Sequence, residues 1–263
     1  MMGWLRGFFT VIVAVLLFFS VFSLSLFGIV STSLTYDNVY KESSVIFGDI
    51  LSNVNVSLVI EKNYPMIVSF CENNSEYVFS EGGYVFDISC ESVMQGTEAI
   101  LEDGIKSVIS KIYYDDYSID ASNYIDEPQN APLFLISEQA HDSASRIFYY
   151  SILASLILLA ALFFLVENKS NTFLISGIYF VLNSLMFFKI NNLFSLFSDG
   201  VVFKFLGIFF STSFSVSVKL LIIGILLIVI AIVFKVFKVG FWISSVMEKF
   251  QKRSKPEMKI KKR

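Results

Sequence analysis

Residues 8–30 read FFTVIVAVLLFFSVFSLSLFGIV, a run of 23 residues with neither a charge nor a proline. At about 1.5 Å per helical residue the run would cover roughly 34 Å, and the hydrocarbon core of a bilayer is about 30 Å thick. The alternative is a cleaved signal peptide, whose apolar region is about 7 to 15 residues long and ends at a small-x-small site. Residues 31–33, Ser-Thr-Ser, match such a site poorly. The run therefore predicts a transmembrane helix at Phe8–Val30.

The composition extends this interpretation to the whole chain. Hydrophobic residues make up 55% of the 263 residues, charged residues only 16%, and the mean hydropathy is +0.67. Soluble domains are usually about 45 to 50% apolar. Further spans are expected at Ile147–Val166, Thr172–Phe188 and Val218–Phe237, and the short connection Glu167–Asn171 makes the second and third antiparallel neighbours.

Charge predicts the orientation of these spans. Residues 31–145 contain nineteen Asp and Glu against four Lys and Arg, whereas residues 235–263 contain ten Lys and Arg against two Asp and Glu. Basic residues near span ends stay on the cytoplasmic side, so Arg6 and the carboxyl-terminal tail are expected inside. Two internal termini require an even number of crossings, which agrees with four spans and places the acidic block outside.

The predicted order of parts follows from these spans and charges. It is a cytoplasmic N-terminus and first span (1–30), an acidic exterior domain (31–146), a second span (147–166), a third span (172–190), an outer loop (191–217), a fourth span (218–238) and a basic cytoplasmic tail (239–263). Within the outer loop, Phe203–Phe214 is expected to be interfacial or re-entrant, because Lys204 and Lys219 can reach lipid headgroups.

The exterior block contains the chain's two cysteines, Cys71 and Cys90. An oxidising exterior allows a disulfide to persist, and the alternative is two buried thiols in a cytosolic domain. Between the cysteines, two β-favouring segments flank Ser80-Glu81-Gly82-Gly83, which predicts a hairpin whose open end the disulfide would close.

The rest of the exterior block is expected to be two amphipathic helices followed by a linker. Apolar residues recur near a 3.6-residue period over Tyr36–Val54 and again over Val93–Ile112. The segment Asp126–Pro132, with its two prolines and Asn130, is the expected linker to the second span. The predicted fold class is a polytopic α-helical membrane protein: four transmembrane helices with a small α+β exterior domain, of two helices plus a disulfide-linked hairpin, between spans 1 and 2.

Three sequence patterns suggest binding or modification sites. Oxygen-bearing side chains at EF-hand-like spacing indicate a candidate calcium site at Asp116, Ser118, Asp120 and Glu127, although Ala121 stands where the sharp turn calls for Gly. Two sequons indicate glycosylation at Asn55 and Asn73. Basic residues expected to contact anionic lipid, ahead of nucleic acid or an acidic protein, are Lys249, Lys252, Arg253, Lys255, Lys259, Lys261, Lys262 and Arg263.

The absence of certain residue types and motifs from the sequence reduces the number of possible functions. No span contains Asp, Glu or His, which ion-coupled transporters place in the bilayer, and familiar nucleotide-binding and hydrolase motifs are missing from the sequence. The expected function is a non-enzymatic membrane protein of the cell surface, without a cofactor, whose acidic domain binds another membrane or surface protein or contributes to envelope assembly. The alternative is an accessory subunit of a transport or channel complex, with Lys189, Asp199, Lys204 and Phe203–Phe214 lining an outer vestibule.

Overall fold

The computed structural model describes residues 2–53, 56–81, 84–117, 134–190 and 207–237. The chain divides into two compact units. One, here called the span unit, comprises residues 1–28, 146–190 and 213–263, and the other, here called the acidic unit, comprises residues 29–145 and 191–212.

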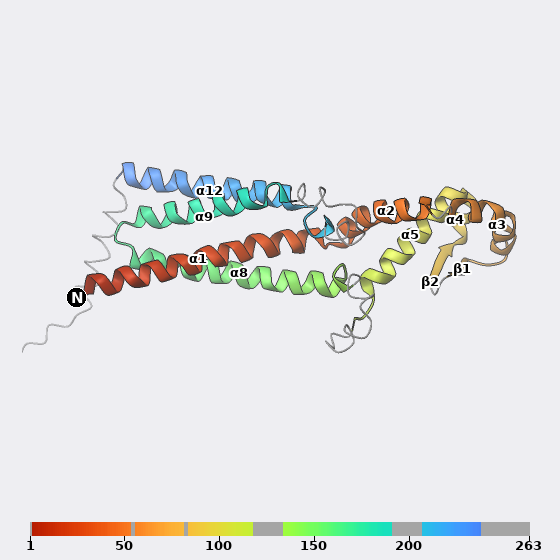
Figure 1. Ribbon diagram of the computed structural model, residues 1–263, viewed down its shortest axis with the longest axis horizontal. Coiled ribbons are helices and arrows are strands. Elements are labelled where there is room, and N and C mark those ends of the chain that lie inside the picture. The colour runs from red at the N-terminus through yellow and green to blue at the C-terminus, as the bar shows by residue number, and fades with distance from the viewer. Residues whose placement is uncertain (1, 54–55, 82–83, 118–133, 191–206, 238–263) are drawn as a thin grey trace, which may run out of the picture. The chain divides into compact units, whose positions relative to one another are not determined.

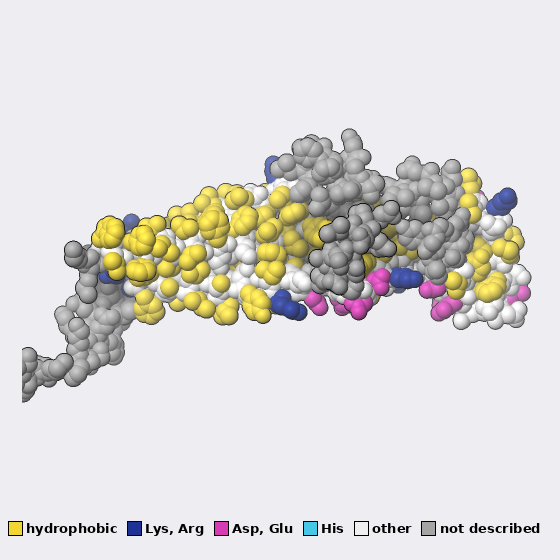
Figure 2. Space-filling view, turned by 60° about the horizontal axis from the view of Figure 1, so that its bottom comes forward, with side chains coloured by type: hydrophobic (Ala, Val, Ile, Leu, Met, Phe, Trp, Pro, Cys, Tyr) yellow, Lys and Arg dark blue, Asp and Glu magenta, His cyan; other side chains and the backbone are white. Residues whose placement is uncertain are grey.

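Four helices are long and apolar enough to span a membrane. They are α1 (Met2–Ser33), α8 (Glu138–Leu165), α9 (Lys169–Phe187) and α12 (Ser213–Val236). In the span unit these helices lie side by side along their length (Figure 1). Hydrophobic side chains cover most of the face of the long helices that is in view in Figure 2, as lipid contact requires.

The structure places several helix ends outside the predicted spans. Helix α8 begins at Glu138, nine residues before the apolar run, and α12 begins at Ser213 rather than at Val218. Lys219 does not interrupt α12 because its side chain is exposed, whereas Ser213 and Ser217 beside it in sequence are buried. Residues 203–206 of the predicted interfacial segment lie outside the described residues; the remainder contains a helical turn at 207–209 and the start of α12.

Helices α9 and α12 come into close backbone contact at two glycines. A Cβ atom added to Gly177 would lie 2.8 Å from the Gly224 carbonyl oxygen, and one added to Gly224 would lie 3.0 Å from the Gly177 carbonyl oxygen. Helix backbones that touch in this way need small residues, because lipid offers no hydrophobic driving force between helices and close packing must hold them together.

Helix α1 packs against both α8 and α9. Leu17 and Val21 of α1 are buried with Leu162 of α8. Aromatic contacts join α1 to α9, with ring centroids 5.4 Å apart for Phe18 and Tyr179.

The acidic unit contains more helices than the sequence analysis expected. Its elements are α2 (Tyr36–Asn53), α3 (Val56–Cys71), β1 (Glu76–Glu81), β2 (Tyr84–Ser89), α4 (Cys90–Gln95) and α5 (Thr97–Tyr114). Helix α3 was not predicted, and the expected helix over Val93–Ile112 is divided between α4 and α5. The division occurs at Gly96, whose φ of 119° is a conformation that favours glycine.

Helix α2 does not simply continue α1. Leu34 and Thr35 separate them, and the Thr35 carbonyl oxygen accepts hydrogen bonds from the backbone N–H groups of Asn38 and Val39. Leu34 is buried in a hydrophobic cluster with Val39 and Ile109, so the break is fixed by packing.

Strands β1 and β2 form an antiparallel hairpin in which Tyr77 pairs with Ile88 and Val78 pairs with Asp87. The strands extend through Glu81 and from Tyr84, so the connection is shorter than the four-residue turn that was predicted. Gly82 and Gly83 lie outside the described residues. Ile88 is buried and Val78 is exposed, so one face of the hairpin meets a core and the other meets solvent.

Candidate interaction surface

The Cys71–Cys90 disulfide organises the part of the acidic unit that carries the candidate surface. Cys71 ends α3 and Cys90 begins α4, with their Cα atoms 5.2 Å apart. Both are buried in a cluster with Ile67, Ile88 and Val93. The bond therefore ties α3 to the open end of the hairpin, where the Cys90 N–H also donates to the Ser75 carbonyl oxygen.

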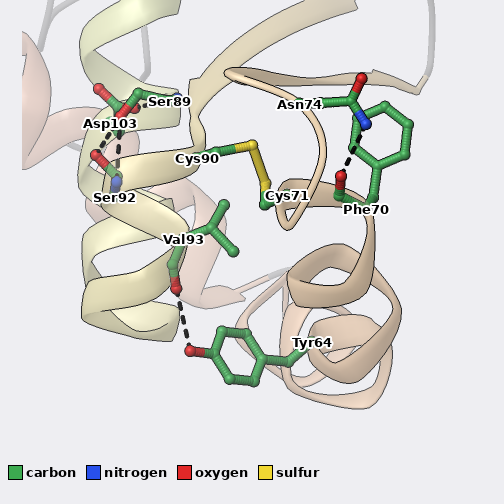
Figure 3. The surroundings of a disulfide bond; sticks show 9 residues. All are labelled: Tyr64, Phe70, Cys71, Asn74, Ser89, Cys90, Ser92, Val93 and Asp103. Carbon is green, nitrogen blue, oxygen red and sulfur yellow. Dashed lines mark hydrogen bonds between the residues drawn. A yellow bond between two sulfur atoms is a disulfide. The ribbon is translucent and has the colours of Figure 1, made fainter.

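Polar side chains around the disulfide fix the neighbouring elements (Figure 3). The Tyr64 hydroxyl of α3 donates to the Val93 carbonyl oxygen at 3.0 Å. The Asp103 carboxylate of α5 accepts from the Ser89 N–H at 2.7 Å, and the Ser89 hydroxyl accepts from the Ser92 N–H at the start of α4. Three helices and β2 are thus held around one covalent bond.

Helix α3 turns an apolar stripe outward. Met66 is 60% exposed and Phe70 is 46% exposed, although both are large apolar side chains. Val59 is exposed two to three turns earlier on the same side of the helix, and Leu58 beside it in sequence is exposed as well. The other side of the helix carries Ile60, Tyr64 and Val68 toward the core. Exposed apolar side chains that share one face of a helix are typical of an interaction surface.

Carboxylates are exposed on the elements around the disulfide. Those exposed on α3, on α4 and at the hairpin are Glu61, Glu72, Glu76, Asp87 and Glu91. In the described part of the chain, Arg6 pairs with Glu167 and the His141 ring contacts Asp142, so none of these five carboxylates is in a salt bridge there. Lys62 is the one exposed basic side chain of α3.

The hydrophobic cluster around Leu34 in the acidic unit contains a buried tyrosine, Tyr113. The Tyr113 hydroxyl of α5 donates to the Leu34 carbonyl oxygen at 2.9 Å. Burial, followed by the charges of Glu138, Tyr114 and Asp142, raises the pKa of Tyr113 to about 12. Burial and nearby acidic groups also raise the pKa of Tyr40. Both hydroxyls stay protonated at neutral pH, and that of Tyr113 is a hydrogen-bond donor in the core.

The structure describes one of the four residues of the predicted calcium site, Asp116. The Asp116 carboxylate accepts from the Gln139 side-chain N–H at 2.7 Å. Ser118, Asp120 and Glu127 lie outside the described residues. Among the residues that are described, no three His, Cys, Asp or Glu side chains gather as metal ligands would.

The other predicted site residues are placed as follows. Asn73 is exposed in the bend between α3 and β1, two residues after Cys71, in a position open to modification. Asn55 and all the basic residues of the tail lie outside the described residues, as do Asp199 and Lys204.

In the span unit, polar groups join the helices. The Ser20 and Ser155 hydroxyl oxygens lie 2.9 Å apart, as do those of Ser23 and Ser151. Between α9 and α12, the Ser184 hydroxyl donates to the Ser217 carbonyl oxygen at 2.7 Å. Small hydroxyl side chains of this kind hold membrane helices together.

At one end of the span unit, two cations bind backbone carbonyl groups. The Arg6 Nε donates to the Leu165 carbonyl oxygen at 2.6 Å, and the Lys169 Nζ donates to the Phe163 and Val166 carbonyl oxygens. These carbonyl groups lie in the last turn of α8 and just after it. Cations are favourable there because the carboxyl-terminal end of a helix carries a partial negative charge. The short connection between α8 and α9 is fixed by this arrangement.

Sequence reasoning did not find the exposed stripe of α3. Its signal was the set of apolar residues between Leu58 and Phe70, but apolar residues also occupy the buried side of the helix, so no single periodicity stands out. Comparison with known protein families, with curated proteins and with solved structures gives no match for this chain.

Proposed function

We propose that this chain is a non-enzymatic, multi-pass membrane protein of the cell surface that acts in protein interaction or envelope assembly. In this proposal both termini are cytoplasmic and residues 31–146 form a small α+β exterior domain. The exterior location is supported by the disulfide at Cys71 and Cys90 and by the distribution of Lys and Arg, of which residues 31–145 contain four and residues 235–263 contain ten.

The observation that carries the proposal is the apolar stripe of α3. Met66 and Phe70 are exposed beside a disulfide that fixes the end of their helix. Ordering a flexible surface on binding costs conformational entropy, so a preformed stripe binds more tightly than a mobile one would. The stripe therefore supplies the apolar centre that partner binding requires.

The exposed carboxylates on α3, on α4 and at the hairpin indicate the chemistry of the partner. A surface with Lys or Arg around an apolar centre would complement them, and opposite charge mainly increases the rate and specificity of association. A nucleic acid would be repelled by the same carboxylates. The expected partner is another membrane or surface protein, with the bilayer as the second contact of the chain.

Site-specific photo-crosslinking in intact cells tests this function. A photoreactive residue replaces Met66 in the stripe or, as the control, exposed Glu102 on α5. We expect a discrete protein adduct from position 66 that Phe70→Asp abolishes, and no such adduct from position 102. Adducts only with lipid, or equal adducts from both positions, would contradict the proposal.

The alternative, an accessory subunit of a transport or channel complex, is favoured by polar atoms buried in the span unit. Asn183 is fully buried, and its side-chain oxygen has no hydrogen-bond partner among the described residues. The hydroxyl groups of Ser213 and Ser217 share this property. Purification of the full chain in mild detergent distinguishes the two functions, because stoichiometric recovery of a transporter or an ATPase supports only the alternative.

A further inference from the structure

One edge of the hairpin is closed by α5. The Asp87 N–H donates to the Ser107 hydroxyl at 3.3 Å, and the Ser89 N–H donates to the Asp103 carboxylate at 2.7 Å. Both donors belong to β2 and both acceptors belong to α5. Two backbone N–H groups of β2 that do not pair with β1 are therefore occupied by side chains of its own unit.

The other edge of the hairpin, on β1, is open. Along each strand of an antiparallel pair, the backbone N–H and C=O groups of alternate residues bond to the partner strand, and those of the residues between them point away from it. The N–H groups of Asp87 and Ser89 point away from β1. The backbone N–H and C=O groups of their partners, Val78 and Glu76, therefore point away from β2. Within the described part of the chain, no hydrogen bond joins the backbone N–H or C=O of Val78 or Glu76 to another residue.

The side chains along this edge are accessible. Val78 is 56% exposed and Glu76 is exposed, and Asp87 lies beside Val78 on the same outer face of the hairpin. Tyr77 and Ile88 point to the opposite face, where they pack in the cluster around the disulfide. An incoming strand would thus meet free backbone groups, one apolar side chain and two carboxylates without disturbing the core.

We propose that β1 binds an extended segment of a partner protein by strand addition, so that the hairpin becomes a three-stranded sheet. This inference rests on the proposed function and names the partner's chemistry: an apolar residue beside Val78 and Lys or Arg beside Glu76. Opposite charges on neighbouring strands stabilise a sheet, and like charges destabilise it. A second copy of this chain fits less well, because it would bring a block with the same excess of acidic residues.

The test uses the full chain in phosphatidylcholine nanodiscs and a rhodamine-labelled peptide, Lys-Thr-Val-Thr-Val-Thr-Lys, with binding followed by fluorescence anisotropy. Val78→Pro removes the outward N–H while leaving the pairing with β2, since proline is tolerated where a strand's N–H faces solvent. Val78→Thr is the matched control that keeps the N–H. We expect saturable binding by the wild type and by Val78→Thr, and a loss of about tenfold for Val78→Pro. Glu76→Lys should weaken binding several-fold.

Hydrogen exchange keeps the test independent of how well Val78→Pro folds. In the wild type, the peptide should slow exchange of the Val78 amide and leave the Tyr77 amide, which already pairs with β2, unchanged. Equal binding by Val78→Pro and Val78→Thr, no saturable binding, or pairing of two chains in place of peptide binding would overturn the inference. If photo-crosslinking from position 66 persists in that case, the inference fails alone; if the crosslinks are also missing, the proposed function fails with it.

Discussion

Gly177→Ala tests the packing of α9 against α12 with a single added methyl group. The new Cβ would lie 2.7 Å from Ile228 Cγ1 and 2.8 Å from the Gly224 carbonyl oxygen. Carbon atoms in good contact are about 3.5 to 4.0 Å apart, so the new Cβ and Ile228 Cγ1 must separate by about 0.8 Å or more. The backbone oxygen cannot turn aside as a flexible side chain could.

The expected cost follows from two opposing effects. Overpacking of a tight contact costs about 1 to 3 kcal/mol, whereas alanine is favoured over glycine in a helix by about 1 kcal/mol. The net expectation is a loss of about 1 kcal/mol in the free energy of unfolding. Gly7→Ala in α1 is the control, because nothing lies within 4 Å of the added Cβ.

Reversible unfolding of the purified chain in mixed micelles of dodecylmaltoside and dodecyl sulfate, followed by far-UV circular dichroism, measures the difference. We expect Gly177→Ala to unfold at a lower fraction of dodecyl sulfate than the wild type, and Gly7→Ala to be unchanged or slightly stabilised. Equal stabilisation by both substitutions would refute the close crossing of α9 and α12 at these glycines.

Three other predictions concern bonds described above. Replacing Cys71 and Cys90 by Ser should reduce the free energy of unfolding of the acidic unit by about 3 kcal/mol, seen as earlier loss of its α5 amide protection in hydrogen exchange; unchanged protection would contradict it. Tyr113→Phe should flatten the pH dependence of stability. The folded-state pKa of about 12 lies above the ordinary 10.0, so this tyrosine's contribution is complete below pH 10 and is lost as pH rises toward 12; an equal slope in wild type and variant would count against it. A double-mutant cycle of Ser23→Ala and Ser151→Ala should give a coupling of about 0.6 kcal/mol in the mixed micelles, and zero coupling would show that the hydroxyl contact adds nothing.

The four long helices could be predicted from the sequence because lipid imposes a simple rule. A helix that crosses a bilayer needs about 20 apolar residues, and Phe8–Val30 satisfies this without any knowledge of its neighbours. The helix ends were less predictable. Helix α8 starts at Glu138 because a helix can continue in a water-exposed region, where hydropathy no longer reports it.

The helices and strands of the acidic unit were harder to predict because they depend on tertiary contacts. The Cys71–Cys90 pairing and the hairpin followed from composition and turn chemistry, whereas α3 contains Pro65 and apolar residues on two sides, which obscure a helical period. The open edge of β1 could not be predicted at all. It depends on Asp103 and Ser107 of α5 accepting hydrogen bonds from β2 and not from β1. No local sequence pattern indicates against which strand a helix later in the chain packs.

The account depends most on the proposal that the acidic unit lies outside the cell and the basic tail inside. Single cysteines introduced by Glu98→Cys on α5 and by Lys259→Cys in the tail test it with a membrane-impermeant maleimide on intact cells. The account predicts that position 98 is labelled at once and that position 259 is labelled only after the membrane is permeabilised. Labelling of position 259 in intact cells, with position 98 protected until permeabilisation, would contradict it.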